Sequence, residues 1–344
     1  MKQFIAGLIF AASWAASLST SASAQEVTLR LHHFLPPQSA VPANFIEPWA
    51  RQIEAESDGR IAVQLFPAMQ LGGKPSALYD QARDGVVDII WTLTGYTPGR
   101  FPRSEVLELP FIALNAEKSS RVAWQLFEDA LREDFGDVHM LAVHVHSPGV
   151  IHVKGDGVAT LEDMSGLTLR APTQAASALL TELGATPVGM PVPAVPEALS
   201  RGVIDGTVIP WEVATPLRIA ELVDAHTEFA GPNSLYTAFF VLAMNQERYD
   251  SLPEDLQTII DNHSGEETAA WIGRVMDEAD ATGIAAAERE GNPIITIAGE
   301  EEARWQALSE TVIADWIASR TEAGIDAQAL VDRTRELMAE EAKN

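Results

Sequence analysis

The sequence predicts an α/β protein built of two lobes that several chain crossings connect. Short strand patterns alternate with helical patterns along the chain, and this alternation is typical of parallel or mixed sheets covered by helices. The alternation resumes in the middle of the chain without a low-complexity linker, so two separate domains joined by a flexible linker are not expected. A length of 344 residues suits two domains or one large one.

The first third of the chain contains three strand patterns and two helical patterns. Pro36 and Pro37 end the first strand, and Asp58-Gly59 ends the first helix. The strands cover residues 27–34, 61–67 and 87–93, and the helices cover residues 45–59 and 75–85. Because ligands bind at the carboxyl ends of the strands in such sheets, residues that follow each strand are the first candidates for a site.

The remainder of the chain continues this order. A proline-poor stretch, residues 253–290, predicts one long helix. Residues 203–211 predict a short strand that leads into a helix. The other strand patterns cover residues 140–146, 167–172 and 237–244, and a further helix covers residues 174–183.

The composition excludes several classes of function. The chain has 49 acidic and 23 basic residues, a net charge of −26, which repels phosphate backbones and anionic membrane surfaces. It has no cysteine, so disulfides, thiolate nucleophiles, iron–sulfur clusters and cysteine-based zinc sites are excluded. Nucleic-acid binding and direct membrane insertion of the mature chain are therefore not expected.

The first 24 residues have the layout of a secretory signal peptide. Lys2 precedes an apolar stretch that runs to about Leu18, and Ala22-Ser23-Ala24 forms a small-residue cleavage site. The alternative is a membrane anchor, which needs about 20 consecutive apolar residues. The serine-rich end of this segment does not supply them, so we expect cleavage after Ala24 and export of an acidic mature chain.

Sequence signatures of catalysis are absent. The chain has no nucleophile-elbow serine, no HExxH, no GxGxxG and no phosphate-binding P-loop. His144 and His146 share one face of a predicted strand, but no carboxylate or third histidine stands at a metal-ligand spacing, so no metal and no cofactor are expected. His32 and His33 are adjacent in a strand, and we assign His33 to the ligand cleft.

Arg170 is the strongest candidate for a binding residue. It ends an apolar strand, where a guanidinium can hold a carboxylate or sulfonate with two hydrogen bonds. Aromatic residues follow or end other predicted strands, and together with Arg170 they describe a pocket for a small anion with an apolar or cationic body. These aromatic candidates are Phe34, Trp91, Tyr96 and Trp211.

Seven short motifs, in order behind the predicted signal peptide, resemble the DctP-type solute receptors of tripartite ATP-independent periplasmic (TRAP) transporters. Two of the clearest are Met164 to Pro172, which contains Arg170, and Glu197 to Gly206, which ends in an Asp-Gly pair. The other five lie at residues 59–72, 84–88, 108–111, 183–187 and 252–257.

The resemblance implies a periplasmic-binding-protein clamshell with a long helix across both lobes. It implies lobe I from residues 25–147 and 236–277, lobe II from residues 148–235 and 278–344, and no enzymatic activity. It also implies that Arg170 binds the carboxylate of an organic acid that is passed to TRAP membrane subunits. Tyr236 and Phe239, near the return to lobe I, are further candidates.

Two departures from the family pattern narrow the ligand. Ile209 stands where many members have an asparagine, and a second arginine found in sialic-acid-type members is replaced near Val150. Both changes remove polar partners, which favours a monocarboxylate with an aromatic or apolar body, such as a 2-oxo or 2-hydroxy acid. A zwitterionic osmolyte with an ammonium or sulfonium group, and less readily a dicarboxylate, are the alternatives. A hydrolase or lyase that uses His146 with Asp205 is a more remote one.

Overall fold

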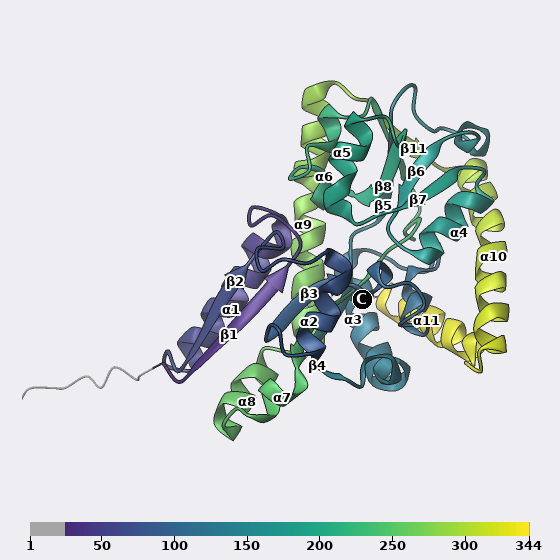
Figure 1. The fold of residues 1–344 in the computed structure, drawn as a ribbon. Helices are drawn as coiled ribbons and strands as arrows, with labels where there is room; N and C mark the ends of the chain where they lie inside the picture. Colours follow the sequence, from purple (N-terminus) through teal and green to yellow (C-terminus); the bar gives the residue numbers. More distant parts are fainter. Residues whose placement is uncertain (1–24, 344) are drawn as a thin grey trace, which may run out of the picture.

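The computed structural model describes residues 25–343, so the predicted signal peptide lies outside the described residues. Two mixed β-sheets form the centres of two lobes, one at the lower left and one at the top of Figure 1. This confirms the two-lobed α/β architecture that the sequence predicts. Among residues 25–343, none of the helices has the length and hydropathy that are needed to cross a bilayer.

The first lobe is built on a five-stranded sheet with the order β2-β1-β3-β10-β4. Strands β1, β2 and β3 run parallel, and β10, which arrives from the second lobe, is antiparallel to both β3 and β4. Apolar residues of β1 such as Leu29 and Leu31 are fully buried, which fixes the face that packs on the helices. The strands are β1 (Val27–His33), β2 (Ile61–Phe66), β3 (Ile89–Leu93), β4 (Val138–Val145) and β10 (Phe239–Asn245).

The second lobe is built on a six-stranded sheet with the order β11-β9-β5-β8-β6-β7. Strands β6 and β8 run parallel, so their carboxyl ends meet at one edge of the sheet. The strands are β5 (Gly149–Val153), β6 (Thr168–Ala171), β7 (Thr186–Gly189), β8 (Gly206–Pro210), β9 (Ala225–Phe229) and β11 (Ile294–Ile297).

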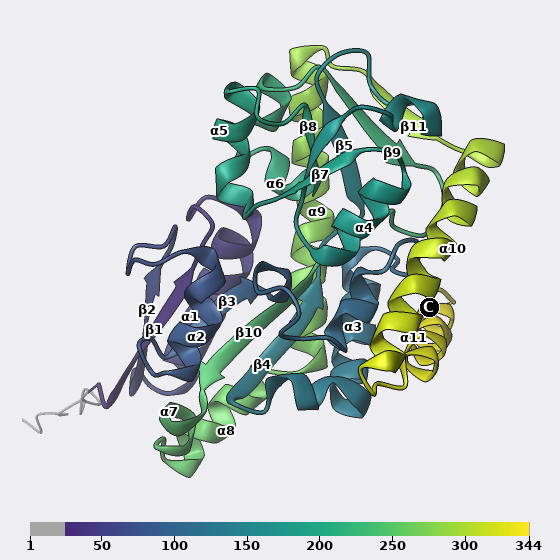
Figure 2. The same cartoon turned by 45° about the vertical axis from the view of Figure 1, so that its right-hand side comes forward.

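Helices cover both sheets and connect the two lobes (Figures 1 and 2). They are α1 (Glu47–Glu56), α2 (Leu78–Arg83), α3 (Ala116–Leu126), α4 (Gln174–Glu182), α5 (Val195–Ser200), α6 (Trp211–Ala214), α7 (Gln246–Asp250), α8 (Glu254–Asn262), α9 (Glu266–Glu290), α10 (Gly299–Glu322) and α11 (Ala327–Glu341).

The long helix α9 packs on both lobes, against α3 and β4 in the first and against α6 in the second. Two glycines permit this close packing. A Cβ atom at Gly273 would overlap the backbone of Ala116 at the start of α3, and a Cβ atom at Gly283 would overlap the backbone of Trp211 at the start of α6. The helix therefore fixes the positions of both helix starts.

The structure corrects two predictions about the C-terminal half. The long helix expected over residues 253–290 is two helices, α8 and α9, which are separated at Gly265, where φ is 91°. Residues 278–344 were expected to lie in lobe II, but α11 packs against α3 of the first lobe. Arg320 of α10 also forms an ion pair with Glu105 of the first lobe, so the C-terminal helices bridge the lobes.

Candidate ligand-binding site

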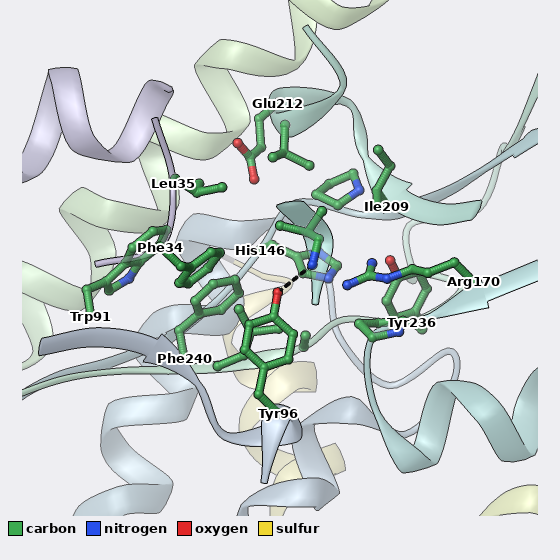
Figure 3. Close-up of a pocket in the computed structure, with 16 residues that line it drawn as sticks. Phe34, Leu35, Trp91, Tyr96, His146, Arg170, Ile209, Glu212, Tyr236 and Phe240 are labelled. Atoms are coloured by element: carbon green, nitrogen blue, oxygen red, sulfur yellow. Dashed lines mark hydrogen bonds between the residues drawn. The ribbon is translucent and has the colours of Figure 1, made fainter. Parts of the chain in front are cut away.

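A cavity lies between the two lobes (Figure 3). The cavity is narrow, with a volume of about 30 Å³. Its wall is mostly apolar, and the polar side chains in it are Tyr96, His146, Arg170, Glu212 and Tyr236. Residues of both lobes and of the crossings between them face this space, as expected for a ligand site in a two-lobed α/β fold.

Three stacked aromatic rings form the first-lobe side of the cavity. The ring of Phe34, just after β1, stacks on Trp91 of β3 with centroids 5.2 Å apart and planes 6° from parallel. Phe240 of β10 also stacks with Trp91, with ring centroids 5.2 Å apart. The indole Nε1 of Trp91 donates to Nε2 of His144 at 2.8 Å, which fixes the central ring. Tyr96 meets Phe34 edge-on and completes a wall that suits a flat apolar group.

Arg170 enters the cavity from β6 of the second lobe (Figure 3). Its side chain is buried, with the residue only 2% exposed. Nε donates to the carbonyl oxygen of Met190 at 2.9 Å, and Nη1 donates to that of Val208 at 3.2 Å. Nη2 has no hydrogen-bond partner, and within residues 25–343 Arg170 forms no ion pair with a carboxylate. Burial lowers the pKa of Arg170, yet an arginine keeps its proton, so this guanidinium is a buried cation that lacks an anion.

Neutral hydrogen-bonding groups surround this cation. The hydroxyl oxygen of Tyr96 accepts a hydrogen bond from the backbone N–H of Val192 at 3.0 Å, which leaves its own hydrogen free to donate. The hydroxyl of Tyr236 is buried without a partner. Burial raises the pKa of both tyrosines and lowers the pKa of His146 to about 4, so all three side chains are uncharged at neutral pH. The two tyrosine hydroxyls can donate to an anion without adding charge, whereas neutral His146, whose Nδ1–H faces the carbonyl oxygen of Ser147, offers only an acceptor at Nε2.

The position of Tyr236 depends on a glycine. A Cβ atom at Gly149, at the start of β5, would overlap the ring of Tyr236. The backbone N–H of Gly149 also donates to the hydroxyl oxygen of Ser234 at 3.2 Å, and this contact ties β5 to the segment that carries Tyr236. Only glycine at position 149 therefore leaves room for the ring.

Glu212 of α6 is the acidic residue on the cavity wall. Its backbone N–H donates to the Asp280 carboxyl of α9 at 2.9 Å, while its own Oε2 is buried and has no partner. Burial and the nearby charge of Asp280 raise the pKa of Glu212 to about 8, so it holds a proton at neutral pH. One turn earlier on α9, Asp277 accepts the backbone N–H of Ala116 at 2.8 Å. Helix α9 thus holds α3 of one lobe and α6 of the other with two carboxyl groups.

The structure brings six of the nine predicted site residues together around the cavity. They are Phe34, Trp91, Tyr96, Arg170, Ile209 and Tyr236. Ile209 pairs across the sheet with Val150, so the two positions that depart from the family pattern are neighbours and both are apolar. Both positions therefore present buried apolar side chains in the structure.

Trp211, His33 and Phe239 do not line the cavity, so their assignment to it is corrected. The ring of Trp211 packs against His152 and His226, which contact each other in the second lobe. His33 packs edge-on against Trp91 from outside the cavity. Phe239 points to the opposite face of β10, where it stacks with Phe135.

Ten of the 16 lining residues were not predicted as site residues, and the polar or aromatic ones among them are His146, Glu212 and Phe240. Phe240 and Glu212 each follow a residue that was assigned to the site, so a difference of one position separates the prediction from the structure. His146 was considered as a metal ligand and as a catalytic base with Asp205. Its Nδ1 bonds the carbonyl oxygen of Ser147, whereas a carboxylate oxygen of Asp205 accepts the backbone N–H of Thr168, so the two do not form a pair. The described residues contain no group of three side chains that could hold a metal ion.

Comparisons with known proteins agree with this architecture. The family model described as bacterial extracellular solute-binding protein, family 7, matches residues 31–319. A TRAP solute-binding protein from Rhodoferax ferrireducens T118, solved with copurified benzoate, is 46% identical with a TM-score of 0.90, over 92% of this chain and 98% of that one. A marine metagenome TRAP solute-binding protein specific for aromatic acids, solved with 3-hydroxybenzoate, is 42% identical with a TM-score of 0.91, over 92% and 99% of the two chains.

A further protein is similar to this chain over most of its length. The outer membrane transporter protein TsaT of Comamonas testosteroni is 26% identical over 321 residues, which cover 92% of this chain and 93% of that protein. The family model covers most of this chain, and the similar structures are TRAP solute-binding proteins. The chain therefore belongs to the DctP family, family 7 of the bacterial extracellular solute-binding proteins.

Proposed function

We propose that this protein is a periplasmic receptor for an aromatic monocarboxylate, which it delivers to the membrane subunits of a TRAP transporter for ion-coupled uptake. The observation that carries the proposal is the guanidinium of Arg170, which is buried at the cavity with Nη2 unpaired. A carboxylate there would receive a charge-assisted hydrogen bond from Nη2, with the hydroxyls of Tyr96 and Tyr236 as further donors.

The shape and charge of the cavity favour an aromatic ligand with one carboxylate. The stacked wall of Phe34, Trp91 and Phe240 suits a planar ring. Arg170 is the one basic side chain of the cavity lining besides the neutral His146, so a second carboxylate would have no cation of its own. The relatives solved with benzoate and 3-hydroxybenzoate support the same ligand class.

Delivery requires the lobes to open and close. The cavity, with a volume of about 30 Å³, is too small to admit an aromatic ring without movement of its walls. The lobes are connected by the strand crossings and by α9, and ligand contacts with both lobes would favour the closed state. Small-angle scattering with and without ligand measures this closure, and an unchanged radius of gyration at saturation would contradict it.

Export to the periplasm and delivery to the membrane subunits can each be tested. Cleavage after Ala24 would leave a mature chain that begins at Gln25, which intact-mass measurement of periplasmic protein determines. Deletion of the membrane subunits should abolish uptake of the ligand while the purified receptor still binds it. Uptake that continues without them would contradict the TRAP assignment.

Calorimetry with three small molecules tests the ligand class. Benzoate, succinate and glycine betaine represent an aromatic monocarboxylate, a dicarboxylate and a zwitterionic osmolyte. We expect benzoate to bind and the other two to bind at least about tenfold more weakly, since each leaves charge or aromatic surface unmatched. Preferential binding of succinate or betaine would contradict the proposal, and chemical conversion of bound benzoate would revive an enzymatic function.

A further inference from the structure

Glu212, the acidic residue of the cavity, lies away from Arg170, and the pairing of that cation with a carboxylate does not explain its presence. Figure 3 shows its carboxyl group pointing into the cavity from α6, on a different side from Arg170. Within residues 25–343 it forms no ion pair with a lysine, arginine or histidine, and its Oε2 is buried without a hydrogen bond. A buried polar group without a partner is unfavourable, so a ligand atom is the natural partner for this oxygen.

The protonation state of Glu212 determines which ligand groups it can bind. Its pKa of about 8 means that the carboxyl group is protonated at pH 7, so it can donate through O–H and accept through its carbonyl oxygen. It therefore offers no fixed negative charge to a quaternary ammonium group. The nearby side chains of Leu35 and Val213 are apolar and do not compete for the hydrogen bond.

We propose that Glu212 is a specificity residue that selects aromatic carboxylates with a hydroxyl group on the ring over the unsubstituted acid. The ring hydroxyl would pair with the free Oε2 while the carboxylate lies at Arg170. Both polar ends of the cavity would then be satisfied by one ligand, with the ring against the wall of Phe34, Trp91 and Phe240. This inference rests on the proposed function, because it assumes that the carboxylate occupies the Arg170 end.

The test compares affinities for benzoate, 3-hydroxybenzoate and 4-hydroxybenzoate at pH 7 by titration calorimetry. The wild-type protein should bind at least one hydroxybenzoate about tenfold more tightly than benzoate, the effect of one additional hydrogen bond in a buried site. Glu212→Leu has a similar volume but no polar atom, so it should reduce this ratio to about one. Glu212→Gln keeps a donor and an acceptor, so it should retain most of the preference.

A matched control is Glu197→Leu, the same substitution at an exposed glutamate of α5 outside the cavity, which should keep the wild-type ratio. The inference is overturned if benzoate binds as tightly as both hydroxybenzoates, or if Glu212→Leu keeps the preference. Failure of all three aromatic acids to bind the wild-type protein would instead refute the proposed function, so the two failures are distinguishable. If Glu212→Leu does not fold, as judged by circular dichroism, a loss of the preference in Glu212→Gln at pH 7 would overturn the inference and its retention would support it.

Discussion

The substitution Arg170→Ala is the most informative change in the cavity. In the structure, Nε and Nη1 are held by two backbone carbonyl oxygens, at 2.9 and 3.2 Å, while Nη2 is free. The guanidinium is thus fixed in place before the ligand arrives, and little ordering is left to occur on binding. Removal of one partner from a buried, hydrogen-bonded charge pair costs about 2 to 5 kcal/mol. Affinity for benzoate should therefore fall by about 30-fold to about 5,000-fold.

Titration calorimetry at pH 7 measures this loss, with circular dichroism to confirm that the variant is folded. The matched control is Arg201→Ala, because Arg201 lies in the same lobe but is exposed and pairs with Glu197 on the surface. That control should bind benzoate with wild-type affinity. Arg170→Lys should fall between the two, since it keeps the positive charge but loses the rigid guanidinium that the carbonyls of Met190 and Val208 hold in place. An affinity of Arg170→Ala within about threefold of the wild type would refute the role of the buried cation.

The remaining predictions concern the surroundings of Arg170. Tyr236→Phe removes an unpaired buried hydroxyl and should weaken benzoate binding about threefold to tenfold in calorimetry, the effect of one lost hydrogen bond; unchanged affinity would show that this hydroxyl does not contact the ligand. Gly149→Ala should displace the ring of Tyr236, lower the free energy of unfolding in urea by about 1 to 3 kcal/mol and also weaken binding, whereas wild-type values of both would contradict the close approach. Glu212 has a pKa of about 8 in the folded state and an ordinary pKa of 4.5 in the unfolded chain. Between these two values the folded state keeps a proton that the unfolded chain releases. The free energy of unfolding therefore falls as the pH rises from about 4.5 toward 8. Glu212→Gln lacks this effect, and its free energy of unfolding relative to the wild type should rise by up to about 2.7 kcal/mol between pH 5 and pH 7; a difference that does not change with pH would contradict the raised pKa.

Much of the first lobe could be predicted from the sequence because its strands are buried apolar runs with clear ends. The strand expected at residues 27–34 is β1 (Val27–His33), and the one expected at 87–93 is β3 (Ile89–Leu93). In the second lobe, β7 and β11 have four residues each and carry few buried side chains, so they have no distinct pattern. The break between α8 and α9 was missed because Gly265 is a single glycine in an otherwise helical stretch.

The site could be predicted to within one residue at most positions, and the errors have a common cause. Phe239 and Phe240 are adjacent on β10, and only the pairing of Phe240 with Leu93 of β3 decides which of them faces the cavity. Trp211 and Glu212 are likewise adjacent at the start of α6, whose orientation is set by the contact of Glu212 with Asp280, a residue 68 positions away. Such long-range contacts are not visible in local sequence patterns. Arg170 was identified because its signal is local, an arginine at the end of a buried strand.

A crystal structure of the protein with benzoate is the most direct test of whether Arg170 binds the ligand carboxylate. We predict a carboxylate oxygen of benzoate about 3 Å from Nη2 of Arg170, a normal hydrogen-bond distance, with the ring against Phe34, Trp91 and Phe240. A benzoate carboxylate bound away from Arg170, with Nη2 still unpaired, would contradict it.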